Sequence, residues 1–327
     1  MEGFSGSRGE EFVAVEAMIL AAGEGTRLLP LTRQKPKPLF PILTQPLLHL
    51  TLDYLEQFDL QRVTLNTHHL AAQIEDFIRT EKQIRSFEIQ TSFEPTILGT
   101  GGGIGRTRNF WSDSPFLVIN GDIVTNIDLF KALEFHRSHQ GPVTLIVHDY
   151  KEFNQVAVDP QGRIADFRLE KGNGAAFTGI HILDRSIFTD LPSSGSYDII
   201  PIYQQMIRKG IPIRAYVSQG HYWRDIGTPK SYLRIHEELL TGSAHFPFLM
   251  PKGSGGRLIH PDSQIEKGVE LSGWVCLGKG CRLREGCRIH NSVLWEEVDV
   301  EPGREISESI IGRGLSITRD MRGEVLV

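Results

Sequence analysis

The sequence has few cysteines, no long apolar run and no excess of basic residues. Three cysteines occur in 327 residues (Cys276, Cys281 and Cys287), too few for a disulfide framework, so we expect a reducing, cytoplasmic location. The sequence contains no run of 18 apolar residues, so we expect no membrane span. The polar stretch 1–11 does not suggest a signal peptide. Lys and Arg total 35 against 40 Asp and Glu, a net charge of −5, which excludes a strongly basic nucleic-acid binder.

What the sequence does have is glycine, 33 residues in all, and a length that predicts about two domains. Up to residue 240, short apolar runs typical of strands alternate with stretches of helical spacing. The expected strands are 13–22, 63–66, 87–92, 116–120, 143–147 and 211–217, and the expected helices are 47–58, 70–78, 129–139 and 199–208. This alternation predicts an α/β domain over 13–240, with a Rossmann-like, mostly parallel sheet covered by helices on both faces.

The pattern changes after residue 240. Residues 241–256 are rich in Gly, Ser and Pro and predict a linker. Apolar residues then recur every six positions, which predicts a short left-handed parallel β-helix over 257–327. The two rows are Ile259, Ile265, Leu271, Leu277, Leu283, Ile289 and Val269, Val275, Cys281, Cys287, Val293. The rows cover about two coils, whose ends we expect to be covered by the first domain or by another copy of the chain, and we expect a homo-oligomer. Cys281 and Cys287 then serve as small apolar filler rather than metal ligands.

A glycine-rich turn follows the first expected strand. Gly23 and Gly25 let backbone N–H groups approach a phosphate. The dinucleotide fingerprint fails because residue 28 is Leu, and the Walker loop fails because Thr26 and Arg27 follow Gly25. Arg27 can fork onto phosphate oxygens. Lys37 lies between two prolines that we expect to fix an extended loop and aim its ammonium group. The alternative is a surface turn with solvated charges.

Three further motifs could carry chemistry. Residues 98–103 (LGTGGG) predict a loop against which a flat ligand can lie. Asp122 ends a buried strand, where doubly wound sheets bind ligands, and magnesium prefers one or two carboxylates plus substrate phosphates; a turn or helix-cap aspartate is the alternative. Asp225 lies in WRDIGT, where Thr228 and Pro229 also suit a helix start.

The adjacent His68 and His69 point to opposite faces if they lie on a strand. Joint metal ligation is therefore disfavoured, and a polar lining or capping role is preferred.

The segment GEGTRLLPLTRQKPKPLFP resembles the signature of the sugar-1-phosphate nucleotidylyltransferases, and the resemblance continues over about 225 residues. It implies four catalytic residues: Arg27 and Lys37, which hold a nucleoside triphosphate, and Asp122 and Asp225, which bind Mg²⁺. The nucleotide-binding residues that it implies are Leu20, Ala21, Ala22, Gly23, Gly25, Thr26, Glu94, Gly99, Thr100 and Gly101.

The resemblance also implies a sugar-phosphate site. It places Glu170 on sugar hydroxyls and Lys171 on the phosphate, although Gly172 replaces a family proline. The remaining residues of this site are Asn120, Gly121, Thr178 and Gly179. Phe153-Asn154 stands where the family often has Tyr-Gly, which argues against a simple glucose site.

The implied reaction joins a nucleoside triphosphate to a sugar 1-phosphate and releases pyrophosphate. Positioning and charge stabilisation suffice for this chemistry. GTP with mannose or heptose 1-phosphate is favoured, and UTP with N-acetylmuramate or hexose 1-phosphate is the alternative. A non-catalytic sugar-nucleotide sensor and an acyltransferase built on the β-helix are alternatives of other classes. The sensor is disfavoured because Arg27, Lys37 and both aspartates are present. The acyltransferase is disfavoured because the repeat covers only about two coils and its only histidines, His260 and His290, do not occupy an evident catalytic position.

Overall fold

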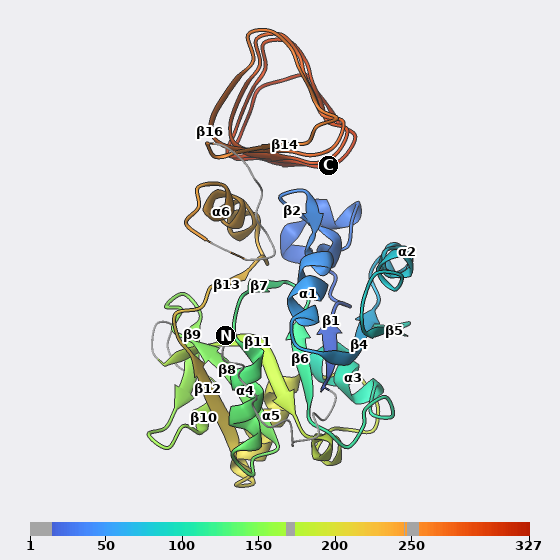
Figure 1. The fold of residues 1–327 in the computed structure, drawn as a ribbon, viewed down its shortest axis with the longest axis vertical. Helices are drawn as coiled ribbons and strands as arrows, with labels where there is room; N and C mark the ends of the chain where they lie inside the picture. The colour runs from blue at the N-terminus through green and yellow to red at the C-terminus, as the bar shows by residue number, and fades with distance from the viewer. Residues whose placement is uncertain (1–14, 168–173, 245, 247–254) are drawn as a thin grey trace, which may run out of the picture.

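The computed structural model describes residues 15–167, 174–244, 246 and 255–327 (Figure 1). An α/β part comes first, and a triangular stack of short strands follows it. In the described residues no helix has the length and apolar character needed to cross a membrane.

The main sheet confirms the predicted Rossmann-like architecture. Four parallel strands lie in the order β5-β4-β1-β6. Beyond β6 the sheet continues through β11, which runs antiparallel to β6, β8 and β9 and was not predicted. The strands are β1 (Val15–Leu20), β4 (Leu60–Thr67), β5 (Glu88–Phe93), β6 (Phe116–Asn120), β8 (Val143–His148), β9 (Asn154–Val158), β10 (Ile164–Asp166), β11 (Ala175–Leu183) and β12 (Ile213–Ser218).

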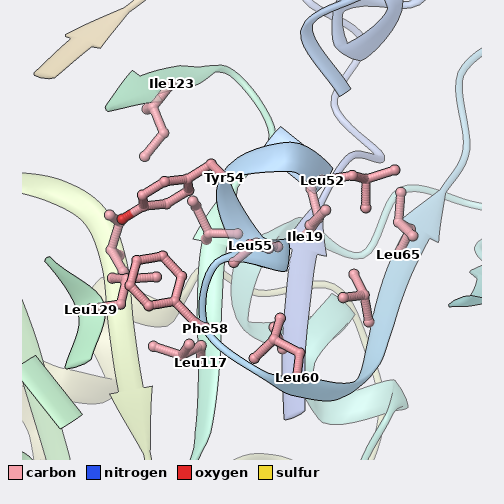
Figure 2. Packing of buried hydrophobic residues seen from close by; sticks show 14 of the residues in the cluster. Ile19, Leu52, Tyr54, Leu55, Phe58, Leu60, Leu65, Leu117, Ile123 and Leu129 are labelled. Carbon is pink, nitrogen blue, oxygen red and sulfur yellow. The ribbon is translucent and has the colours of Figure 1, made fainter. Parts of the chain in front are cut away.

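Helices cover both faces of this sheet, as predicted. Successive strand side chains point to opposite faces, so Ala17 and Ile19 join one core and Met18 joins the other. Figure 2 shows α1 packed by Leu52 and Leu55 on the first of these faces. The helices are α1 (Leu47–Glu56), α2 (Ala71–Glu81) and α4 (Leu129–Arg137) on that face, and α3 (Gly99–Arg106) and α5 (Ile199–Arg208) on the other.

Short elements connect the sheet to the second part of the chain. Thr228 caps α6 (Pro229–Leu240) through a capping box with Ser231, which confirms the expected helix start. The other short elements are η1 (Thr26–Leu28), η2 (Leu31–Arg33), η3 (Lys37–Leu39), η4 (Arg185–Thr189), and the strand pairs β2 (Pro41–Ile42) with β3 (Gln45–Pro46) and β7 (Ile123–Thr125) with β13 (Trp223–Asp225).

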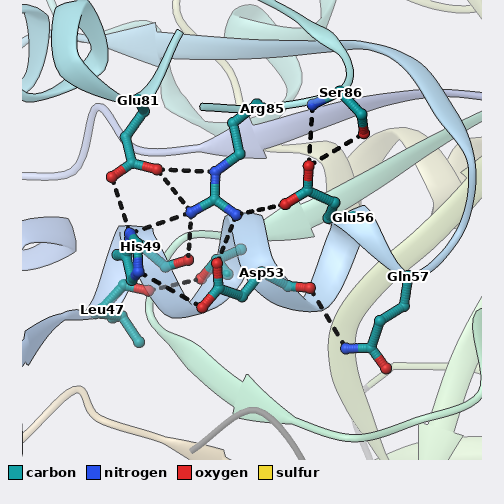
Figure 3. A network of polar contacts seen from close by, with 9 residues as sticks. Leu47, His49, Asp53, Glu56, Gln57, Glu81, Arg85 and Ser86 are labelled. Carbon is teal, nitrogen blue, oxygen red and sulfur yellow. Dashed lines mark hydrogen bonds and ion pairs between the residues drawn. The ribbon is translucent and has the colours of Figure 1, made fainter. Parts of the chain in front are cut away.

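A clamp of charged groups ties α1 to α2 (Figure 3). The guanidinium of Arg85 is almost fully buried and contacts the carboxylates of Asp53, Glu56 and Glu81 at 2.5, 2.8 and 2.6 Å. Burial opposes the charge of Arg85, but its three carboxylate partners raise its pKa. His49 joins the network through Glu81 at 2.8 Å. The clamp fixes α1, against which the η3 turn packs.

The predicted β-helix is present, but the expected extent of two coils is wrong. Its strands stack in parallel columns, one of which contains Leu258, Cys276, Val293, Ile310 and Val325. The spacings in that column are 18, 17, 17 and 15 residues, so the six-residue period already fails within the second coil while the stacking continues. The strands are β14 (Arg257–Ile259), β15 (Gln264–Ile265), β16 (Glu270–Leu277), β17 (Arg282–Leu283), β18 (Arg288–Leu294), β19 (Asp299–Val300), β20 (Glu305–Ser307), β21 (Ile310–Ile311), β22 (Ser316–Ile317), β23 (Met321–Arg322) and β24 (Val325–Leu326).

The cysteines behave as apolar filler. Cys281 and Cys287 lie in the buried interior of the β-helix, and all three thiols are free. Burial raises the pKa of the Cys281 thiol to about 11, which makes it a poor nucleophile.

A continuous apolar core joins the β-helix to the α/β part. One side of the triangle faces α6 and the segment around β2 (Figure 1). Trp274 and Trp295 from the β-helix share this core with Phe40 and Tyr232. Phe246, from the expected linker, is also buried there. The expected boundaries at residues 240 and 257 stay predictions; α6 ends at Leu240 and β14 begins at Arg257.

Candidate active site

A cavity of about 370 Å³ opens at the carboxyl ends of β1 and β6. The two strand ends are joined there, because the N–H of Gly121 donates to the carbonyl of Leu20 at 2.9 Å. The sequence-predicted residues that line the cavity are Leu20, Ala21, Ala22, Gly23, Gly25, Thr26, Arg27, Lys37, Glu94, Gly99, Thr100, Asn120, Gly121 and Asp122. Sequence reasoning missed Pro38, Asn66, Ile97 and Asp198, which also line it.

The turn after β1 requires glycine at position 25. Its φ is +63°, and a Cβ there would lie 2.8 Å from Cγ2 of Thr32. A Cβ at Gly23 would meet nothing within 4 Å. Gly25 therefore shapes the turn, whereas Gly23 faces open space in the cavity.

Lys37 is aimed into the cavity, but not by an extended loop. Pro36 is extended, and Lys37 begins the one-turn η3 helix with Pro38 at its second position. A proline in a first helical turn is tolerated because that N–H has no partner there anyway, so the expectation of an extended loop is wrong. Lys37 is buried, and its Nζ lies 2.5 Å from Oδ2 of Asp122.

The fold brings Asp122 and Asp225 together although a hundred residues separate them. Strands β7 and β13 pair directly after Asp122, and the N–H of Ile226 donates to the Asp122 carbonyl at 3.0 Å. Burial and the negative charge of Asp122 raise the pKa of Asp225, against the opposing effect of Lys37 and Arg27. The N–H of Gly227 donates to Oδ1 of Asp225 at 2.6 Å.

Gly227 lies where the Arg27 guanidinium approaches this pair. A Cβ at position 227 would lie 2.6 Å from Nη2 of Arg27 and 2.6 Å from Oδ1 of Asp225. Two carboxylates and two cations therefore meet at one end of the cavity.

A buried carboxylate forms the other end. Glu94 is fully buried; its Oε1 accepts from Nδ2 of Asn66 at 2.8 Å and its Oε2 from the N–H of Leu98 at 2.9 Å. Asn66 is held in turn by the N–H of Ala21 at 2.7 Å. Among the described residues no cation lies within ion-pair distance of Glu94. A carboxylate has about four acceptor positions; these two hydrogen bonds use two of them, and Glu94 also lines the cavity.

The glycine-rich segment 98–103 is not a loop, contrary to expectation. Gly99 begins α3, and a Cβ at Gly101 would lie 2.6 Å from the ring of Tyr197. A Cβ at Gly103 would lie 2.7 Å from Nδ2 of Asn66. These glycines let α3 pack closely against the protein, so Gly101 does not line the cavity, whereas Gly99 and Thr100 do.

Comparison with known proteins agrees with this geometry. Residues 16–242 match the family model described as nucleotidyl transferase. The chain is 31% identical to a mannose-1-phosphate guanylyltransferase of Mycobacterium tuberculosis over 88% of this chain and 82% of that protein. It belongs to the sugar-1-phosphate nucleotidylyltransferase family.

Further similarities cover both parts of this nucleotidyltransferase. Residues 254–325 match the model described as GMPPB C-terminal domain. A UTP--glucose-1-phosphate uridylyltransferase of Synechocystis is 27% identical over 91% of this chain and 87% of its own. The crystal structure of HddC from Yersinia pseudotuberculosis complexed with GMP-PN superposes with a TM-score of 0.59 at 26% identity, covering 68% of this chain and 97% of that one. Enzymes of the family generally use a divalent metal ion.

The sugar-side residues of the enzyme are only partly placed. Glu170 and Lys171 lie outside the described residues. Thr178 is buried and donates to the carbonyl of Ile146 at 2.7 Å. Gly179 has φ of +78°, and a Cβ there would lie 2.5 Å from Nδ2 of Asn120. The residues that line the nucleotidyltransferase cavity do not include Thr178, Gly179 and Asp225.

The departure at Phe153-Asn154 proves to be structural. Asn154 is buried, accepts from the N–H of Tyr150 and donates to Asp149, each at 2.8 Å. Phe153 is partly exposed and packs on Trp223, with ring centroids 5.6 Å apart. The Asn154 amide therefore holds a turn.

The two adjacent histidines anchor loops. His68 Nδ1 lies 2.8 Å from the Glu94 carbonyl, and His69 Nε2 lies 2.7 Å from the Thr32 carbonyl. Over the described ranges, no cluster of three or more His, Cys, Asp or Glu side chains could hold a metal.

Proposed function

We propose that the enzyme transfers a guanylyl group from GTP to mannose or heptose 1-phosphate. The buried Glu94 carboxylate carries this choice of nucleotide. Guanine presents two neighbouring donors, N1–H and the 2-amino group, to the acceptor oxygens of this carboxylate. Uracil presents one N–H between two carbonyl oxygens, which a carboxylate repels. The similarity to a mannose-1-phosphate guanylyltransferase supports the same choice.

The cationic end of the cavity suits the triphosphate. In the proposed complex, Arg27, Lys37 and the backbone N–H groups of the turn at residues 23–26 bind the phosphate oxygens. An oxygen of the sugar phosphate attacks the α-phosphorus in line. The bond from this phosphorus to the oxygen that bridges to the β-phosphorus breaks, and pyrophosphate leaves with that oxygen and its electron pair. Lys37 and Arg27 stabilise the charge that develops on the phosphate oxygens.

The pair Asp122 and Asp225 fits a magnesium ion. Mg²⁺ takes oxygen ligands and is usually held by one or two carboxylates together with substrate phosphates. Two neighbouring, half-buried carboxylates meet beside the cavity. When bound, Mg²⁺ would neutralise phosphate charge and orient the triphosphate. The two aspartates would hold it in place.

We assign the sugar phosphate to the part of the cavity that Asn120 and Gly121 line at the end of β6. The family resemblance places Glu170 and Lys171 on the sugar hydroxyls and phosphate, with Thr178 and Gly179 beside them.

A screen of four nucleoside triphosphates against a set of sugar 1-phosphates tests the assignment, with pyrophosphate release as the readout. We expect the highest kcat/KM with GTP and with mannose or heptose 1-phosphate. Preference for UTP with N-acetylmuramate, glucose or another hexose 1-phosphate would replace the guanylyl assignment by the uridylyl one, which the 27% identical Synechocystis uridylyltransferase makes the second candidate.

We also propose that copies of the chain associate through the first coil of the β-helix, in a reducing, cytoplasmic compartment. Ile259 and Ile265 of that coil are 37% and 41% exposed, whereas their stacking partners Leu277 and Leu283 are buried. A second copy would cover this end. Light scattering of the wild-type chain and of Ile265→Lys tests this, with a mass of 36.7 kDa expected for the variant and a multiple of it for the wild type.

A further inference from the structure

The β-helix grips the segment that carries Lys37. We call residues 34–43 the signature segment. The side chain of Gln34 exchanges two hydrogen bonds with the backbone of Arg313, at 3.1 and 3.4 Å. At the other end of the segment, Sγ of Cys276 donates to the Leu43 carbonyl at 3.2 Å. The β-helix thus holds the segment on both sides of Lys37.

Trp295 is the centre of this contact. It is buried, and its ring centroid lies 5.0 Å from that of Phe40 at an interplanar angle of 71°. Trp295 also makes a cation–π contact, in which the ammonium of Lys35 lies 5.6 Å from the Trp295 ring centroid. The indole Nε1–H donates to the Tyr232 hydroxyl at 3.0 Å, and that hydroxyl donates to the Pro41 carbonyl. One side chain therefore fixes Lys35, Phe40 and Pro41.

The path from Trp295 to Lys37 is short. The N–H of Phe40 donates to the Lys37 carbonyl at 3.0 Å and closes the η3 turn. The flanking prolines Pro36 and Pro38 have restricted φ angles, so the segment has few ways to absorb a displacement. A shift of Phe40 would therefore move the Lys37 backbone as well.

We propose that Trp295, although it belongs to the β-helix, is a positioning residue for Lys37. It acts through Phe40 and does not touch the cavity. This inference rests on the proposed role of Lys37 in binding the triphosphate. It also gives the β-helix a function within the reaction, since the β-helix holds the signature segment and that segment places the Lys37 ammonium in the cavity.

A double-mutant cycle tests the proposal. The αβ-methylene analogue of the nucleotide with the highest turnover, with Mg²⁺, is titrated by calorimetry into the wild type, Trp295→Leu, Lys37→Ala and the double variant. We expect Trp295→Leu to weaken binding about tenfold in the wild-type background, since misplacement by about 1 Å can cost far more in activity. In the Lys37→Ala background the same change should cost less than twofold.

Trp274→Leu is the matched control. Trp274 is buried in the same core, and its ring lies 6.5 Å from that of His236 in α6. His236 accepts a hydrogen bond from the N–H of Leu43, so Trp274 reaches the signature segment only at its last residue and not at the η3 turn. It should lower the melting temperature comparably and leave nucleotide affinity within twofold. Equal losses of affinity in both Lys37 backgrounds, or from both tryptophan variants, would overturn the positioning role and leave a general stabilising one.

Trp295→Phe is a second, more conservative variant that keeps the test valid if Trp295→Leu does not fold. It keeps an aromatic ring beside Phe40 and loses the hydrogen bond to Tyr232, so affinity should recover to within about threefold of wild type. Failure of phenylalanine to recover affinity in a folded variant would contradict the path through Phe40. If Lys37→Ala itself binds the analogue like wild type, the proposed role of Lys37 fails; if it binds weakly while Trp295→Leu binds normally, only the positioning role fails.

Discussion

The ammonium nitrogen of Lys37 lies 2.5 Å from Oδ2 of Asp122, and the two residues are 85 positions apart in the chain. Both side chains are mostly buried. Lys37 comes from the η3 turn, which packs against α1, and Asp122 follows the end of β6, so tertiary packing sets the separation of the two groups. This places a cation beside the carboxylate that we propose to hold magnesium.

Replacing Lys37 by alanine should lower kcat/KM by at least about 10²-fold, since one charge-stabilising donor at a reacting phosphate supplies that much. The melting temperature should change little, because the remaining Asp122 carboxylate keeps access to solvent. Steady-state kinetics and a thermal melt measure both effects. Lys131→Ala, at a side chain that is 67% exposed, is the matched control. Full activity of Lys37→Ala would remove Lys37 from the proposed machinery.

Glu94→Gln should reduce discrimination between nucleotides. The variant keeps one acceptor but presents an amino group where guanine offers its own donors, and a buried donor without an acceptor is costly. We expect kcat/KM for GTP to fall about 10- to 100-fold and that for UTP to fall much less. Glu88→Gln, at the start of the strand that Glu94 follows and with an exposed carboxylate, should leave the ratio of GTP to UTP unchanged. An equal fall for both nucleotides would contradict base recognition by Glu94.

The two glycines of the turn should separate backbone strain from ligand contact. Gly25→Ala puts a side chain at φ +63°, 2.8 Å from Thr32, and should cost about 1–2 kcal/mol of stability. Gly23→Ala should leave the melting temperature unchanged, because its Cβ meets nothing within 4 Å, yet raise KM for the triphosphate by filling space in the cavity. An unchanged KM in Gly23→Ala would mean that the triphosphate does not approach this turn.

The sequence predicted best the elements whose pattern is local and strongly periodic. The helix over residues 199–208 and the strand over residues 116–120 have the expected ends. The antiparallel strand β11 was not predicted. It pairs with β6, β8 and β9, and the direction in which a strand pairs leaves no local pattern in the sequence. The later coils escaped because shortening a coil by one residue destroys a strict period without preventing stacking.

The site was predictable in its charges and less so in its backbone. Arg27, Lys37 and Asp122 combine residue types and neighbours that point to phosphate chemistry. Gly101 and Gly103 gave the wrong expectation because a glycine looks the same whether its backbone approaches a ligand or, as here, Tyr197 and Asn66. Asn66 could have been suspected as a polar residue ending an expected buried strand. Asp198, an exposed residue before α5, carries no such signal.

Acid should destabilise the fold through histidines that are buried in the neutral form. Burial lowers the pKa of His181 to about 3, where its Nδ1 lies 2.6 Å from the Tyr203 hydroxyl. In the unfolded chain histidine has a pKa of about 6.5, so below that pH the unfolded state binds a proton that the native state does not. The contribution of the neutral His181 to the free energy of unfolding is complete above about pH 7 and is lost progressively as the pH falls toward the native pKa. Between pH 7.5 and 5.5 it amounts to about 1.4 kcal/mol for one histidine.

Urea unfolding of wild type and His181→Gln at these two pH values measures it. The readout is the change in unfolding free energy between the two pH values, in which any loss of packing common to both cancels. We expect this change to be smaller in His181→Gln than in wild type by about 1.4 kcal/mol. The same experiment on His236, whose pKa burial lowers to about 4, should give a similar difference. If both variants keep the wild-type pH dependence, these histidines already bind protons in the folded protein near pH 6, and their burial does not set its acid limit.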